Sequence, residues 1–218
     1  MLAAAGMVLA VAGAAGFQRE AADFFRSSEM APQRAFARPD RSPTMAIGLS
    51  SVAEGLEPCL IAIDRIAWGK FPEDERRQTA QHCLARADRA LRLYPALAAA
   101  HQLRAECLSL LGATDAAVES LGYAAATAPN DAWLLQRRVM LALLLPRDER
   151  ADLQPLVDAS VIRLMRTFPT RQWLAELYAS APELGNAIAR NEADIAPRDR
   201  LSFLHLAQRA SKPVVREP

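Results

Sequence analysis

The chain lacks an excess of charge of either sign. Its 26 Lys and Arg residues face 25 Asp and Glu residues, which leaves a formal net charge of +1. Binding to nucleic-acid phosphates needs a concentrated basic field, because the affinity comes from charge neutralisation and counterion release. The sequence therefore predicts no nucleic-acid partner, and it favours protein partners.

The chain also lacks the motifs on which common active sites depend. It contains no GxSxG elbow, no Walker glycine loop and no GxGxxG. Its three histidines are His82, His101 and His205, and no two of them are three or four residues apart, so none form a ligand pair on one helical turn. We expect no catalytic residue, no metal site, no cofactor and no small-molecule substrate.

Cysteine is scarce, and the three cysteines Cys59, Cys83 and Cys107 show no CxxC spacing. An odd number cannot all pair within one chain. Cys83 and Cys107 fall on the apolar sides of adjacent predicted helices, which favours small buried residues over a disulfide. A bridge between Cys83 and Cys107 in an oxidising compartment stays open. A metal protein or regulatory enzyme that uses His82, Cys83 and Cys107 is the remotest alternative.

Residues 1–17 lack any charged or hydrogen-bonding side chain. As a helix they would span about 25 Å, slightly less than the ~30 Å hydrocarbon core of a bilayer. We expect an N-terminal apolar helix that acts as a membrane anchor. A signal cleaved near Ala12-Gly13-Ala14 and a buried apolar helix are the alternatives. Because the first basic residue, Arg19, follows the apolar run, the side of the membrane stays open.

Aromatic residues are few (6%), whereas 51% of the chain is hydrophobic, chiefly Ala and Leu, which suits closely packed helices. A polar spacer at 18–44 precedes a predicted helical domain at 45–212 and a tail at 213–218. Residues 45–68 carry a helical face interrupted near Pro58. No stretch shows sustained alternation of apolar and polar residues, so we expect essentially no strand. Further helices are predicted at 74–94, 97–111, 117–128, 131–145, 155–168, 171–180, 183–194 and 198–210.

A repeat is visible in the middle of the chain, where Pro95 and Pro129 are 34 residues apart. The segment 98–131 resembles a tetratricopeptide repeat, whose period is 34 residues. Facing helices approach closely only where small side chains meet, with large ones filling the gaps beside them. The repeat requires, in order, a small residue, a large one, the turn glycine, a small crossing residue, a large one and another small one. The matching positions are Ala105, Leu108, Gly112, Ala117, Leu121 and Ala124.

The outer units are weaker, because Pro169 and Pro197 give intervals of 40 and 28 residues. The array covers about 64–210. The resemblance implies an all-α, TPR-like solenoid of antiparallel helix pairs. The segment PTRQWLAELYASAPELGNAIARNEADIAP, together with the apolar N-terminus, also resembles uncharacterised bacterial envelope-associated repeat proteins that accompany polysaccharide assembly.

The tetratricopeptide resemblance implies that extended peptides or partner helices bind a concave face, lined by the first helix of each pair. Trp133 and Trp173 are either anchors in this groove or core residues between helices. Arg137, Arg138 and Arg171 either pair with an acidic partner or lie in solvent. The partner-binding residues implied by matching positions are Gln102, Glu106, Ser109, Trp133, Gln136, Met140, Trp173 and Glu176.

The sequence thus predicts a non-catalytic protein–protein interaction scaffold. We expect it to be membrane-tethered or exported and to serve envelope polysaccharide or secretion machinery, with membrane or envelope proteins as partners. The alternative is a permanent structural subunit of a membrane protein complex, docked through the N-terminal helix and the repeats. A large apolar patch outside the groove would favour that alternative.

Overall fold

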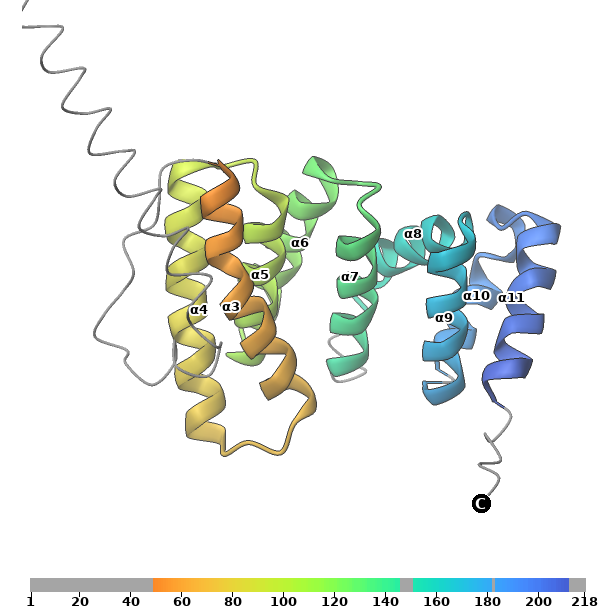
Figure 1. Cartoon of the computed structure of the whole chain (residues 1–218), viewed down its shortest axis with the longest axis horizontal. Coiled ribbons are helices and arrows are strands. Elements are labelled where there is room, and N and C mark those ends of the chain that lie inside the picture. The colour runs from red at the N-terminus through yellow and green to blue at the C-terminus, as the bar shows by residue number, and fades with distance from the viewer. Residues whose placement is uncertain (1–48, 146–150, 182, 212–218) are drawn as a thin grey trace, which may run out of the picture. The chain divides into compact units, whose positions relative to one another are not determined.

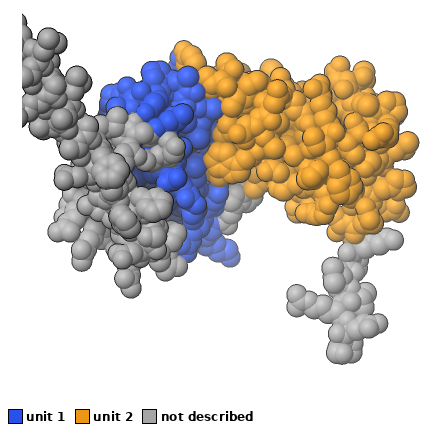
Figure 2. Space-filling model, turned by 45° about the horizontal axis from the view of Figure 1, so that its top comes forward, with its two compact units in different colours: residues 1–120 blue, residues 121–218 orange. Residues whose placement is uncertain are grey.

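The computed structural model describes residues 49–145, 151–181 and 183–211 of the chain. The predicted apolar segment 1–17, the spacer 18–44 and the tail 213–218 lie outside these residues. The chain forms two compact units, residues 1–120 and 121–218, which are coloured separately in Figure 2. The division falls inside helix α6.

The described ranges contain helices and turns but no strand, as the apolar periodicity predicts, so the all-α class is confirmed. Figure 1 labels these helices. Their bounds are α3 Leu49–Trp68, α4 Glu73–Leu93, α5 Ala98–Leu110, α6 Thr114–Thr127, α7 Ala132–Leu144, α8 Gln154–Met165, α9 Phe168–Ser180, α10 Leu184–Arg190 and α11 Pro197–Ala210, with a 3-10 turn at Glu192–Asp194.

In the first unit, α3 packs against α4 and α5, and α4 packs against α5. The shared core contains Leu56, Ile63, Ala87 and Leu103, all at most 2% exposed. Small alanines on α4 let the neighbouring helices approach, and the larger side chains of α3 and α5 fill the space beside them.

Helix α3 continues through Pro58, so the predicted interruption there is wrong. Proline removes one backbone donor and crowds the carbonyl four residues earlier. That carbonyl belongs to Glu54, an exposed residue, where water can take the place of the lost donor. Buried residues on both sides of Pro58, among them Val52 and Ile66, hold the helix against the core.

The turn between α5 and α6 follows the expectation for Gly112, which has a φ of 76°. The amide of Gly112 donates to the carbonyl of Ser109 at 3.1 Å, and the amide of Ala113 donates to that of Leu108 at 2.9 Å. These two bonds form a Schellman motif, in which glycine adopts the left-handed conformation at least cost. Beyond the turn, the hydroxyl of Ser120 donates to the carbonyl of His101 at 2.9 Å and ties α6 to α5.

In the second unit, α7 packs on α8, α8 on α9, and α9 on α11, while α10 packs on α8. Asp131 caps α7 as predicted, because its carboxylate accepts a hydrogen bond from the amide of Leu134 at 3.1 Å. Phe168 begins α9 and does not end α8, which corrects the predicted helix at 155–168. Pro169 is tolerated there, since the first turn of a helix needs no amide donor.

The cysteines pair differently from the bridge left open by the sequence. Cys59 on α3 and Cys83 on α4 form a disulfide, with their Cα atoms 5.4 Å apart. Cys107 on α5 is buried and takes no part in it. A bridge between Cys83 and Cys107 is therefore excluded in this structure.

Candidate interaction groove

A surface groove of about 360 Å³ lies between α9 and α11 in the second unit. Phe168, Gln172 and Glu176 line it from successive turns on one face of α9. Leu206, Arg209 and Ala210 line it from α11. The volume is at the lower end of the range for small-ligand sites.

The groove is lined by both apolar and charged side chains. Phe168 is 56% exposed, although a large aromatic ring is costly to leave in water. Leu206 is 8% exposed, the lowest value among the lining residues, so it forms the floor. Glu176 and Arg209 are both exposed and bring opposite charges to the lining. Such a site suits a large apolar side chain that is flanked by charged groups.

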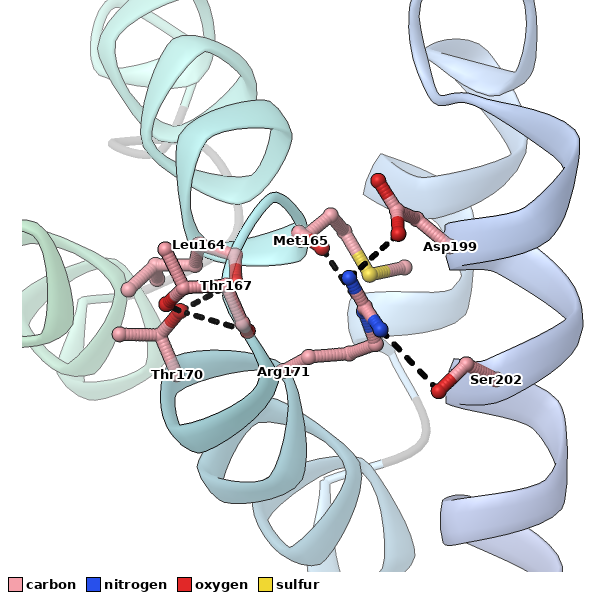
Figure 3. Close-up of polar contacts among 7 residues, drawn as sticks. All are labelled: Leu164, Met165, Thr167, Thr170, Arg171, Asp199 and Ser202. Carbon is pink, nitrogen blue, oxygen red and sulfur yellow. Dashed lines mark hydrogen bonds and ion pairs between the residues drawn. The ribbon is translucent and has the colours of Figure 1, made fainter.

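Arg171 fixes the two helices that form the groove, as Figure 3 shows. From α9, its guanidinium donates to the carboxylate of Asp199 at 2.5 Å and to the hydroxyl of Ser202 at 3.1 Å, both on α11. Its Nε donates to the carbonyl of Met165 at 2.8 Å, near the C-terminal end of α8. One side chain therefore joins three helices and satisfies a carbonyl that the helix end leaves without an intrahelical donor.

A second contact holds α9 and α11 further along. The rings of Tyr178 and Phe203 pack edge to face, with centroids 5.6 Å apart. Next to Arg171, the hydroxyl of Thr170 donates to the carbonyl of Leu164 at 2.5 Å and so fixes the start of α9 on the end of α8. The walls of the groove are thus held in place before any partner binds, which lowers the entropic cost of binding.

The residues predicted on α5 lie mostly inside the protein. Gln102 is fully buried and Glu106 is 5% exposed, and the Nε2 of Gln102 donates to Oε1 of Glu106 at 2.8 Å. Ser109 is half-buried. Gln102 and Glu106 therefore lie inside the protein, and the binding role expected for them stays a prediction.

On α7, Trp133 is 41% exposed, so it is not a core residue. The guanidinium carbon of Arg137 lies 5.1 Å from the centroid of its ring, within the range of a cation–π contact. Gln136 and Met140 on the same helix are half-buried. Trp133 is therefore available at the surface of the second unit.

On α9, Trp173 is half-buried and does not line the groove, whereas Glu176 does. The Nε2 of Gln172 donates to Oε1 of Glu176 at 2.9 Å and orients the carboxylate along the groove wall. Of the eight residues predicted for partner binding, Glu176 is the one that the structure places in this groove.

Two of the three arginines that were expected to pair with an acidic partner or to lie in solvent are buried. Arg138 is 2% exposed and donates to the carbonyls of Ala124 and Ala128, at 3.2 and 3.1 Å, near the end of α6. Burial lowers the pKa of Arg138, and the charge of Arg163 lowers it further. Arg171 is 6% exposed. Both bind partners within the chain, which corrects the expectation of a surface role.

None of the three histidines lines the groove. His82 on α4 is half-buried, and burial lowers its pKa, as does the charge of Arg86. The Nε2 of His101 bonds the carbonyl of Pro95 at 2.8 Å. The disulfide removes Cys83 as a thiolate ligand, so the remote alternative built on His82, Cys83 and Cys107 loses a ligand. Over 49–145, 151–181 and 183–211, no three His, Cys, Asp or Glu side chains gather as a metal site.

The sequence pattern did not indicate Phe168, Leu206 or Arg209 as binding residues. The sequence predicted Phe168 as the last residue of the preceding helix, so its place on the next helix was missed. An aromatic residue directly before Pro169 fits a helix start equally well. Leu206 and Arg209 come from a helix that had no assigned binding role.

Within the described part of the chain, no helix is both long enough and apolar enough to cross a membrane.

Comparisons of the chain with protein-family models, curated proteins and solved structures gave no match.

Proposed function

We propose that the protein is a non-catalytic interaction scaffold whose groove between α9 and α11 captures a segment of a protein partner. The observation that carries this proposal is the exposed ring of Phe168 beside the floor residue Leu206, on two helices that Arg171 holds together. A large aromatic side chain in a pre-formed groove is the kind of residue that contributes most to protein interfaces.

The proposed occupant is a protein segment with one large apolar side chain between a basic and an acidic residue. The apolar side chain covers Phe168 and Leu206. The basic residue faces Glu176, and the acidic residue faces Arg209, so the charges of the groove are complemented. Trp133, exposed on α7, is proposed as a further contact residue.

The scaffold is further proposed to be a tetratricopeptide-like solenoid. Supporting this are the burial of Ala105 and Ala117, at 0% and 1% exposure, and the left-handed Gly112 between α5 and α6. These are the small contact residues and the turn residue that the repeat requires. Membrane tethering or export, and service to envelope polysaccharide or secretion machinery, are proposed on the sequence features alone.

The test is site-specific photocrosslinking in cells that produce the full-length protein. Phe168 is replaced by a photoreactive phenylalanine analogue, and Ala126, exposed on α6, carries the same analogue in the control. We expect a discrete protein adduct from position 168 that is absent from position 126. Absence of any protein adduct at 168, or the same adducts from both positions, would refute the proposal.

The charge part of the proposal has its own control. Glu176→Lys should reduce the adduct from position 168, because it repels the basic residue of the partner. Glu183→Lys makes the same charge change on an exposed residue outside the groove and should leave the adduct unchanged. An equal reduction of the adduct in both variants would show that the net charge of the protein, and not the charge in the groove, governs capture.

The alternative, a permanent structural subunit, is favoured by one observation. Leu201 and Leu204 on α11 are 57% and 53% exposed and do not line the groove. Apolar residues exposed side by side mark surfaces that other chains cover. If the adducts come from an analogue at position 204 and not from position 168, the structural role replaces the groove proposal.

A further inference from the structure

The disulfide joins the first described helix to the rest of its unit. Cys59 on α3 and Cys83 on α4 are 1% and 0% exposed, and both belong to the core shared by α3, α4 and α5. Their Cα separation of 5.4 Å falls in the usual range for a disulfide. The third cysteine of the same core, Cys107, retains its thiol.

This cross-link sits where α3 needs support. Pro58 precedes Cys59 and removes a hydrogen bond from the middle of α3. The bond joins residues 24 positions apart and spans the connection from α3 to α4. The cross-link lowers the conformational entropy of the unfolded chain, and it therefore favours the folded state in which α3 is packed on α4.

A buried disulfide also carries information about the compartment in which the chain folds. Disulfides form and persist in oxidising environments, whereas cytosolic thiol systems keep cysteines reduced. Both sulfurs are inside the folded core, so the bond must form before α3 has closed over α4. It therefore depends on the oxidant present during folding.

We propose that Cys59 and Cys83 are oxidised during folding in an oxidising compartment by a thiol–disulfide oxidoreductase. The two thiols lose two protons and two electrons and form one sulfur–sulfur bond. The disulfide of the oxidoreductase accepts them and becomes two thiols. If residues 1–17 anchor the chain, the described helices lie on the oxidising side of that membrane. This inference stands independently of the groove.

The test is a count of thiols in the full-length protein, trapped directly from the cells that make it. Cells are quenched in acid, the protein is denatured, and free thiols receive a maleimide tag that adds a fixed mass. We expect one tag per chain before reduction and three after reduction. Three tags before reduction would overturn the proposal, whatever the photocrosslinking shows.

Variants and peptide mapping identify the bond. Cys107→Ala should carry no tag before reduction, and Cys59→Ala should carry two. Trypsin places the three cysteines in three different peptides, so the linked pair can be read directly. We expect the peptide of Cys59 joined to that of Cys83, and a bond from Cys107 to either would contradict the assignment.

Discussion

The carboxylate of Asp199 lies 2.5 Å from the guanidinium of the buried Arg171, and this ion pair ties the first turn of α11 to α9. The side chain of Arg171 is 7% exposed and that of Asp199 is 20% exposed. An acidic residue in the first turn also interacts favourably with the helix dipole of α11. The pair therefore sets the spacing of the two helices that form the groove.

Arg171→Met should lower the free energy of unfolding by about 1–3 kcal/mol, because it leaves the carboxylate of Asp199 and the carbonyl of Met165 without their donor. The matched control is Arg190→Met, which removes a more exposed pair with Asp158, where Arg190 is 45% exposed. That change should cost less than about 1 kcal/mol. Urea unfolding followed by circular dichroism measures both values. Equal losses in the two variants would show that burial gives the Arg171 pair no special weight.

Ala117→Leu tests the packing of the buried face of α6. Ala117 is 1% exposed, so a larger side chain overpacks the contact and should cost roughly 1–3 kcal/mol. Ala126→Leu adds the same atoms on the same helix at an exposed position and should change stability by less than about 0.5 kcal/mol. Thermal unfolding of the two variants gives the comparison. An unchanged Ala117→Leu variant would count against a close helix crossing at this residue.

The stability of the protein should depend on pH through His82. Burial and the charge of Arg86 lower its pKa below 6.5, so the unfolded chain binds a proton at pH values where the folded protein does not. In that window the free energy of unfolding falls as the pH falls, and the contribution is fully present above pH 6.5.

His82→Gln should remove this part of the pH dependence, whereas His205→Gln, a change at an exposed residue of α11, should retain it. Urea titrations at a series of pH values below neutrality measure the slopes. If wild type and His82→Gln lose stability in parallel, the pH dependence has another origin.

Trp133→Ala tests the second proposed contact residue. Trp133 is 41% exposed, so its removal should leave the helical content unchanged and lower stability by no more than about 1 kcal/mol. It should also reduce the amount of partner captured at position 168. Circular dichroism separates the two effects. A large loss of helicity would show that Trp133 stabilises the fold and is not a contact residue for the partner.

The local features of the fold follow from the sequence. Apolar periodicity predicts the helices, Gly112 predicts the turn after α5, and Asp131 predicts the cap of α7, because each effect acts over three to five residues. Pro58 gave a wrong prediction of an interruption, because the burial of apolar residues on either side of it stabilises α3 by more than the one lost hydrogen bond costs. This outcome depends on tertiary packing, which cannot be read from a local sequence pattern.

The candidate groove is less predictable, because its residues meet across long sequence separations. Arg171 pairs with Asp199 and Ser202, which lie 28 and 31 residues away in the sequence. The disulfide, which lies outside the groove, likewise joins Cys59 to Cys83, 24 residues away. An arginine is expected at the surface by its polarity, although its five donors can satisfy helix carbonyls and a carboxylate inside the protein. Glu176 is found by repeat position, whereas Phe168 needs the correct start of α9.

The most direct measurement is the affinity of the partner segment, identified by crosslinking from position 168, for the purified full-length protein. Isothermal titration calorimetry compares wild type with Phe168→Ala and Glu183→Lys. We expect Phe168→Ala to weaken binding by roughly 30-fold, equivalent to about 2 kcal/mol, and Glu183→Lys to bind as wild type does. Equal affinity of wild type and Phe168→Ala would contradict a binding role for the groove between α9 and α11.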